Sequence, residues 1–217
     1  MKQQGKAKKF TGKPGIESVT VSEKSVEVMF KNVRLVYDGI SEVCESEFEG
    51  TLAYNFKAGL EIPEGKELTA LKKTIRDHFK AMKLKGFAPD VAIEHFDEKK
   101  FKASNQEGFA LLYPTSPAIE TEDGFQPKGK LFVNPSHEAH YAGCYVDAKV
   151  AFVANTRGAI TIKDYLNAIK KVGDGDAISG AQDPFGDSQS KATVKGVRRQ
   201  EKPDEKPKSG KKPVKKK

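Results

Sequence analysis

Two long stretches of alternating apolar and polar residues, one amphipathic helix and several short strands predict a mainly β protein. Residues 25–37 and 51–62 alternate with the two-residue period of half-buried strands. Residues 68–82 instead repeat their apolar side chains at helical spacing. Strands before and after a single helix favour a small, mainly antiparallel barrel that carries one long α-helix.

The first strand, residues 25–37, changes the parity of its apolar side chains halfway along. The apolar positions are first even and then odd: Val26, Val28 and Phe30, followed by Val33, Leu35 and Tyr37. One extra residue near Lys31–Asn32 would return the second set to the side of the first. The sequence therefore predicts a β-bulge at this point.

The second strand, residues 51–62, alternates without interruption, and the predicted helix follows it. Its apolar face carries Leu52, Tyr54, Phe56, Ala58, Leu60 and Ile62. The helix repeats its apolar side chains at Leu68, Leu71, Ile75, Phe79 and Met82. Gly86 is a plausible end for it, since glycine commonly follows the last helical turn.

The rest of the chain adds shorter strand candidates. Residues 87–106 form a polar segment without a clear period. After it come three strand candidates, at residues 109–113, 129–133 and 144–153. Residues 159–172 start like a strand, yet 161–172 also fit a helix ended by Gly173, so both interpretations stay open. This order and the long bulged first strand fit an OB-fold, a five-stranded antiparallel barrel.

The two ends of the chain carry its basic charge. The formal net charge is +8, with five lysines in residues 1–13 and twelve Lys or Arg in residues 191–217. Residues 14–190 carry a net charge of −6. We therefore expect a disordered basic arm (1–13), a folded domain (14–173), an acidic linker with Phe185 (174–190) and a disordered Lys-rich tail (191–217). The ends should attract polyanions.

Composition excludes several classes of protein. The longest apolar stretch is about Val150 to Ala154, far short of the roughly 20 residues that cross a bilayer. The basic start lacks the apolar core of a signal peptide. Cys44 and Cys144 form no disulfide framework, so we expect a reducing cytoplasm.

Evidence for catalysis in the sequence is weak. Asp90, Glu98 and Lys100 have the outline of a nuclease site, with carboxylates for Mg²⁺ and a lysine for water or phosphate. Any acid- and lysine-rich loop produces this loose pattern, so a metal-dependent nuclease is kept only as an alternative. His137, His140 and Cys144 give three nominal zinc ligands, whereas a closed structural site needs four. The sequence predicts no catalytic residue, metal or cofactor, and no enzyme.

Nucleic-acid binding is favoured, because aromatic and basic residues share the polar faces of the predicted strands. A base stacks on an aromatic ring while a neighbouring cation binds phosphate. A one-residue slip in parity would instead place Phe132 and Tyr145 in the core. An RNA-binding or strand-annealing protein remains an alternative on the same fold. The predicted groove residues are Lys31, Arg34, Tyr37, Lys57, Lys130, Phe132, Tyr145 and Lys149.

Three stretches of the chain resemble the single-stranded DNA-binding proteins of tailed bacteriophages. They are residues 54–79, a strand, a Pro-containing turn and a helix; residues 131–155, with a Tyr-x-Gly-Cys-Tyr-Val segment; and residues 158–187, with a Gly-Asp-Gly turn and an acidic, Phe-bearing end. The resemblance implies an OB-fold that binds single-stranded DNA without sequence preference during DNA replication, recombination or repair.

The chain departs from that family at its end. Members usually finish with an acidic tail that recruits replication enzymes, whereas here the acidic segment 174–187 is internal and a lysine-rich extension follows it. Recruitment of replication or recombination enzymes through 174–187 is therefore an expectation from the resemblance, and a plain linker is the alternative. A homodimer is also left open.

Overall fold

The computed structural model describes residues 10–48, 51–82, 88–94, 96, 100–129, 131–133, 140–155 and 161–178. Two helices lie within this part, α1 (Lys66–Ala81) and α2 (Pro89–Glu94). The long strands are β1 (Gly15–Val21), β2 (Ser25–Phe48), β3 (Thr51–Pro63), β6 (Thr115–Thr121), β9 (Tyr145–Asn155) and β10 (Thr161–Gly173). The short ones are β4 (Lys102–Ala103), β5 (Phe109–Leu112), β7 (Gly124–Pro127) and β8 (Phe132–Val133).

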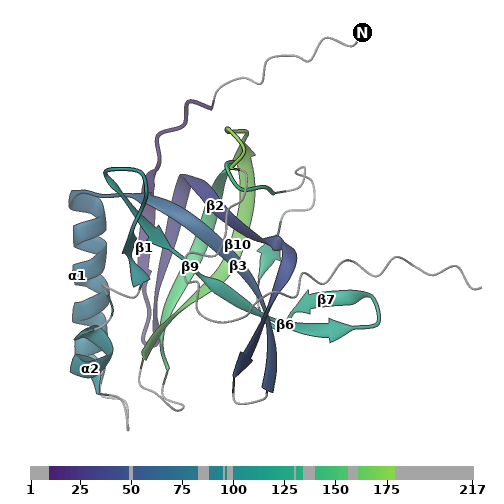
Figure 1. Ribbon diagram of the computed structural model, residues 1–217. Coiled ribbons are helices and arrows are strands. Elements are labelled where there is room, and N and C mark those ends of the chain that lie inside the picture. The colour runs from purple at the N-terminus through teal and green to yellow at the C-terminus, as the bar shows by residue number, and fades with distance from the viewer. Residues whose placement is uncertain are drawn as a thin grey trace, which may run out of the picture.

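Five of these strands close into a ring. β2 pairs with β3 on one side and β9 on the other, and β9 pairs with β10, all antiparallel. β3 pairs with β6, and β6 closes the ring by a parallel pairing with β10. Figure 1 shows the ring with α1 standing beside it. The ring is an OB-fold-like barrel, as the sequence predicted, although one of its five pairings is parallel and not antiparallel.

The predicted bulge in the first long strand is confirmed. The pairing of β2 with β9 shifts register between Phe30 and Val33. Asn32 adopts a φ of 54°, a conformation that asparagine tolerates better than most residues. Its backbone N–H donates to Asp147 Oδ1 at 3.0 Å. Beyond the bulge, Val33 is again fully buried, as the parity argument required.

Several elements differ from the sequence expectations. β2 continues to Phe48, eleven residues past the predicted end. The ambiguous segment is strand β10, because its whole length pairs with β9. β1 was not predicted, although it pairs with β2 along most of its length. The ring strand β6 was not predicted either, although it pairs with β3 and β10. The predicted helix end at Gly86 lies outside the described residues, and α1 ends at Ala81.

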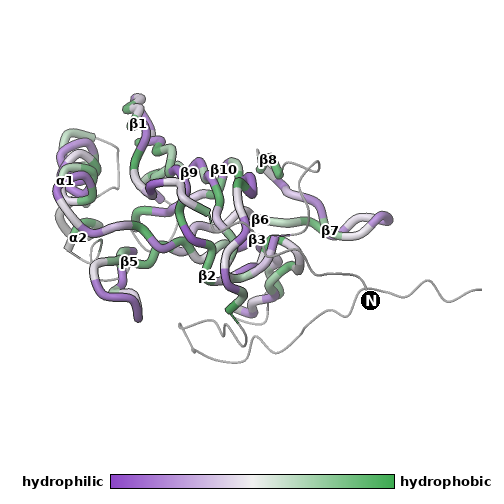
Figure 2. The backbone as a smooth tube through the Cα atoms, turned by 90° about the horizontal axis from the view of Figure 1, so that it is seen from above, coloured by the Kyte–Doolittle hydropathy of each residue, from purple (hydrophilic) through white to green (hydrophobic). Residues whose placement is uncertain are grey.

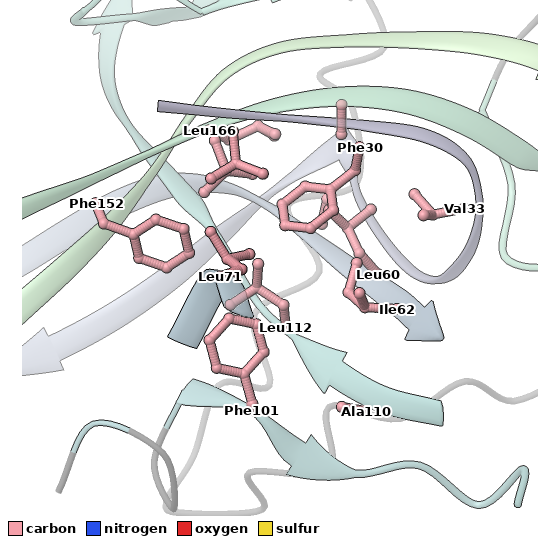
Figure 3. Packing of buried hydrophobic residues seen from close by; sticks show 14 of the residues in the cluster. Phe30, Val33, Leu60, Ile62, Leu71, Phe101, Ala110, Leu112, Phe152 and Leu166 are labelled. Carbon is pink, nitrogen blue, oxygen red and sulfur yellow. The ribbon is translucent and has the colours of Figure 1, made fainter. Parts of the chain in front are cut away.

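The core fills the inside of the ring and the side that α1 covers. Phe30, Leu60 and Leu166 meet inside the barrel, and Leu71 reaches them from α1 (Figure 3). The helix buries the face predicted by its period: Leu68, Leu71, Ile75 and Phe79. Hydropathy alternates along the barrel strands, as expected when one face of each strand is buried (Figure 2).

The segment predicted as a polar excursion also contributes to the core. Phe96 and Phe101 are buried, with ring centroids 5.6 Å apart, and Phe96 lies 6.0 Å from Phe152 of β9. Lys100, between them, forms an ion pair with the buried Asp164 of β10. A segment with a polar sequence thus anchors its few apolar side chains against the barrel.

None of the described helices is long and apolar enough to cross a membrane.

Candidate nucleic-acid interface

Strand register places most of the predicted groove residues on the outer surface of adjoining strands. Arg34 of β2 stands opposite Tyr145 of β9. Tyr37 of β2 stands opposite Gly59 of β3, because a second register shift, between Leu35 and Tyr37, turns it away from the core side on which the parity of residues 33–37 had placed it. Lys57 of β3 lies two residues from Gly59 on the same face. The neighbours of Tyr145 and Lys57 in sequence, such as Val146 and Ala58, are buried. Tyr145, Arg34, Tyr37 and Lys57 therefore share the outer face of three neighbouring strands.

Tyr145 is already covered by other parts of the chain. The ring of Phe10 stacks on it, with centroids 4.7 Å apart and planes 24° apart. Arg34, beside it, donates from Nη2 to the carbonyl oxygen of Asp176 at 3.2 Å. Both partners come from segments adjacent to the ends of the folded domain, so those segments meet on this face.

Tyr37 and Lys57 form a second cluster with two residues that the sequence did not single out. Lys57 Nζ lies over the ring of Tyr37 at 5.6 Å and over the ring of Tyr113 at 5.5 Å. Tyr37 Oη and Cys44 Sγ are 3.1 Å apart, and either atom can donate. The cation–π contacts hold the ammonium group on the outer face beside an aromatic surface.

Lys31 and Lys149 each have an acidic partner. Lys31 Nζ lies 3.0 Å from Asp147 and 3.6 Å from Glu17, and its hydrogen bond to Asp147 raises the Lys31 pKa above its ordinary value. Lys149 Nζ lies 2.7 Å from Glu27. Parity analysis placed both side chains on the outer face, where they are found. It could not show that acids on the neighbouring strands offset their charge.

Phe132 is the most exposed of the large apolar side chains among the described residues, at 60%. It lies on β8 opposite Ala168 of β10, which in turn stands opposite Lys149 of β9. Phe132 is therefore outside the core, as its predicted role requires. Lys130 lies outside the described residues.

A cleft opens beside β8, where the ring closes. β6 and β10 pair at one position only, Thr115 with Tyr165, and the strands part from there. The cleft holds about 260 Å³ and is lined by Ser116, Pro117, Lys128, Gly129 and residues 165–167. Lys128 at its edge is an exposed cation that the sequence analysis did not select.

The segment after β10 crosses the start of β9. The Tyr141 hydroxyl donates to Asp174 Oδ1 at 3.0 Å and accepts from the Gly175 N–H at 3.1 Å. Lys171 lies 2.7 Å from the same carboxylate, and this hydrogen bond lowers the pKa of Asp174. Gly143 has a φ of 112°, and a Cβ there would overlap the backbone of Asp176. The Tyr-x-Gly-Cys-Tyr segment therefore packs against residues 174–176 and holds them in place.

The metal hypotheses gain no support from the geometry. Among the residues that the structure describes, no group of three or more His, Cys, Asp or Glu side chains is placed to hold a metal ion. Cys144 is buried, and burial raises the pKa of its thiol, which disfavours the thiolate that binds zinc. His137 of the nominal zinc set, Glu98 and the side chain of Asp90 lie outside the described part of the chain.

Comparison with known proteins identifies one family. Residues 26–195 match the family of the single-stranded DNA-binding protein of Enterobacter phage Enc34. That span includes the five strands of the ring except Ser25, the first residue of β2. No curated protein matches the chain.

Several solved structures are similar to this chain over most of its length, and two of them represent two different phages. One is the single-stranded DNA-binding protein from bacteriophage Enc34 in complex with single-stranded DNA, with 16% identity, a TM-score of 0.46 and coverage of 77% of this chain and 99% of that one. The other is gp2.5, a single-stranded DNA-binding protein encoded by bacteriophage T7, with 12% identity, a TM-score of 0.43 and coverage of 79% and 98%.

Proposed function

Because the chain belongs to the phage family of the Enc34 single-stranded DNA-binding protein, we propose that it binds single-stranded DNA without sequence preference and protects it during phage DNA replication, recombination or repair. The family match over residues 26–195 carries this proposal. The family consists of DNA-binding proteins that are not enzymes, in agreement with the prediction from the sequence.

The outer face of the barrel supports the proposal through its chemistry. Unpaired bases present flat apolar faces, and the phosphates between them require cations. Tyr145, Tyr37 and Phe132 offer rings on this face, and Arg34 and Lys57 offer positive charge beside them. Lys31 and Lys149 contribute less, because nearby carboxylates already offset their charge.

Titration with labelled oligonucleotides at two salt concentrations tests the proposed function. We expect single strands to bind more tightly than duplexes of equal length, because only unpaired bases can stack on the rings of this face. Affinity for single strands should fall as salt rises, by about 0.7 in the logarithmic slope for each phosphate contact. Preference for duplex DNA, or no binding of either, would contradict the proposal.

The two alternatives are separated by simple assays. A metal-dependent nuclease would cleave the oligonucleotide when Mg²⁺ is added. We expect no cleavage, because Lys100, the lysine of the nominal nuclease site, forms an ion pair with the buried Asp164 instead. An RNA-binding or annealing protein would favour RNA in a competition between DNA and RNA of equal length. We expect DNA to compete at least as well.

Phe132 provides a direct test of stacking. Phe132→Ala should weaken binding of single strands by about 1–3 kcal/mol, the contribution of one stacked base, with little change in salt slope. Stability should hardly change, because most of the side chain is already exposed. Phe132→Tyr is the matched control and should retain affinity, since it keeps the ring. Equal affinity of the alanine variant and the wild type would remove Phe132 from the interface.

The acidic segment 174–187 is proposed as the contact for replication or recombination enzymes in the host cytoplasm. Four aspartates surround its one aromatic residue, Phe185. Asp174 is held by Lys171, so the carboxylates that follow are the ones to test. A peptide of residues 174–190 should compete for such an enzyme, and replacing its aspartates with asparagine should abolish the competition. Size-exclusion chromatography tests the homodimer that the sequence left open.

A further inference from the structure

The ring of Phe10 occupies a flat slot on the outer face of the barrel. It lies on the Tyr145 ring, at 4.7 Å between centroids. Gly173 stands opposite Tyr145 in the β9–β10 ladder, and a Cβ there would overlap the Phe10 ring. A Cβ at Gly12 would overlap the same ring. We call this space, bounded by Tyr145 and Gly173, the Tyr145 slot. The Tyr145 ring offers a flat stacking surface, and the missing side chain of Gly173 leaves room for a planar group on it.

A cation stands next to the Tyr145 slot. Arg34 is the β2 residue opposite Tyr145, and its guanidinium donates to the backbone carbonyl of Asp176. Within the described residues no carboxylate pairs with Arg34, so its charge can be used by an anion. The adjacent Lys31 is held by Asp147 instead. A flat apolar slot beside an uncompensated guanidinium suits one nucleotide, with the base in the slot and the phosphate on Arg34.

We propose that the Tyr145 slot is a nucleobase-binding subsite in which Phe10 stands in for the base when DNA is absent. This inference rests on the proposed function. The two rings are in stacking contact, so a base cannot enter between them and has to replace Phe10. Phe10 therefore competes with DNA for Tyr145.

A double-mutant cycle tests the competition. Wild type, Phe10→Ala, Tyr145→Ala and the double variant are titrated with the same single-stranded oligonucleotide at one salt concentration. Tyr145→Ala should weaken binding about 5- to 150-fold, the loss of one stacked base. Phe10→Ala should tighten binding about 2- to 10-fold, because the slot no longer has to be vacated. In the Tyr145→Ala background this gain should disappear.

Two further variants serve as controls. One tests whether removing any aromatic ring changes affinity, and the other tests whether the Tyr145 slot must be open for DNA to bind. Phe125 of β7 packs on Tyr54 of β3, with ring centroids 4.6 Å apart. Phe125→Ala removes a ring from this other aromatic pair and should leave affinity unchanged. Gly173→Ala places a methyl group where the Phe10 ring lies and should exclude Phe10 and base alike. It should therefore weaken binding instead of tightening it.

The outcomes separate this inference from the proposed function. If the wild type does not bind single strands, the proposed function itself fails. If it binds and Phe10→Ala leaves affinity unchanged or weaker, or if the gain persists without Tyr145, the Tyr145 slot is not a subsite that Phe10 guards. Thermal unfolding identifies any variant that does not fold. Phe10→Leu then replaces Phe10→Ala, since it keeps an apolar side chain without a flat ring, and a gain in affinity is still expected.

Discussion

Replacing Lys100 with methionine is expected to lower the free energy of unfolding by about 3–5 kcal/mol at neutral pH, because it leaves the buried Asp164 carboxylate without its partner. Asp164 is only 5% exposed, and Lys100 is its ion-pair partner. Chemical denaturation measures the loss. Lys149→Met is the matched control, because it breaks the half-exposed pair with Glu27 and should cost no more than about 1 kcal/mol. If both variants lose the same free energy of unfolding, burial of Asp164 is not what makes the Lys100 ion pair important for stability.

The pH dependence of this loss has a definite sign. Burial raises the pKa of Asp164, and Lys100 opposes that effect. Without Lys100 the folded-state pKa is higher still, while the unfolded chain keeps the ordinary value. Below the raised pKa the folded protein holds its carboxyl protonated and uncharged, so the stability deficit of Lys100→Met should shrink as pH falls from neutral. A deficit that grows on acidification would contradict this account.

A double variant separates the cost of an unpaired charge from lost packing. Lys100→Met combined with Asp164→Leu removes both charges and leaves no buried carboxylate. Stability should return to within about 1 kcal/mol of the wild type or exceed it, since apolar replacements of buried ion pairs are often neutral or stabilising. If the double variant is as unstable as Lys100→Met alone, the ion pair is not what Lys100 contributes.

The fold could be predicted well where one face of a strand or helix is buried along its length. The parity change in β2 located the bulge, because the barrel requires Val33 and Phe30 on the same side. β1 was missed because most of its side chains are exposed, and its pairing with β2 depends on backbone hydrogen bonds that have no sequence period. Phe96 and Phe101 were missed because each is an isolated apolar residue among charged ones, so the segment shows no periodic apolar pattern.

The candidate site could be predicted in outline but not in its pairings. Alternation correctly placed Tyr145 and Lys149 on the outer face, because their neighbours Val146 and Val150 are buried. It says nothing about Glu27, which reaches Lys149 only through the β2–β9 register. Phe10 was assigned to a basic arm by composition, and no pattern in the sequence links it to Tyr145. Such contacts depend on long-range register, which a single sequence does not encode locally.

Removing residues 1–9 and 191–217 is expected to lower affinity for single-stranded DNA more than tenfold at low salt and to flatten its salt dependence. These residues contain sixteen Lys or Arg against three acids, and the shortened chain carries a net charge of −5. If only four of the cations contact phosphates, they account for about a 50-fold change in affinity between about 50 and 200 mM salt. The shortened chain keeps Phe10, so the Tyr145 slot is unaltered.

The selectivity of the shortened chain distinguishes the two sources of binding. Lysines in the removed segments interact with phosphates, which duplexes and single strands both carry, whereas rings on the barrel require unpaired bases. Deletion should therefore weaken duplex binding at least as much as single-strand binding, and the preference for single strands should rise. Titration of both forms of DNA with both chains measures this ratio, and thermal unfolding checks that the shortened chain remains folded. An unchanged salt slope would show that the removed segments do not contact DNA. A lower preference for single strands would mean that they, and not the outer face of the barrel, recognise the unpaired strand.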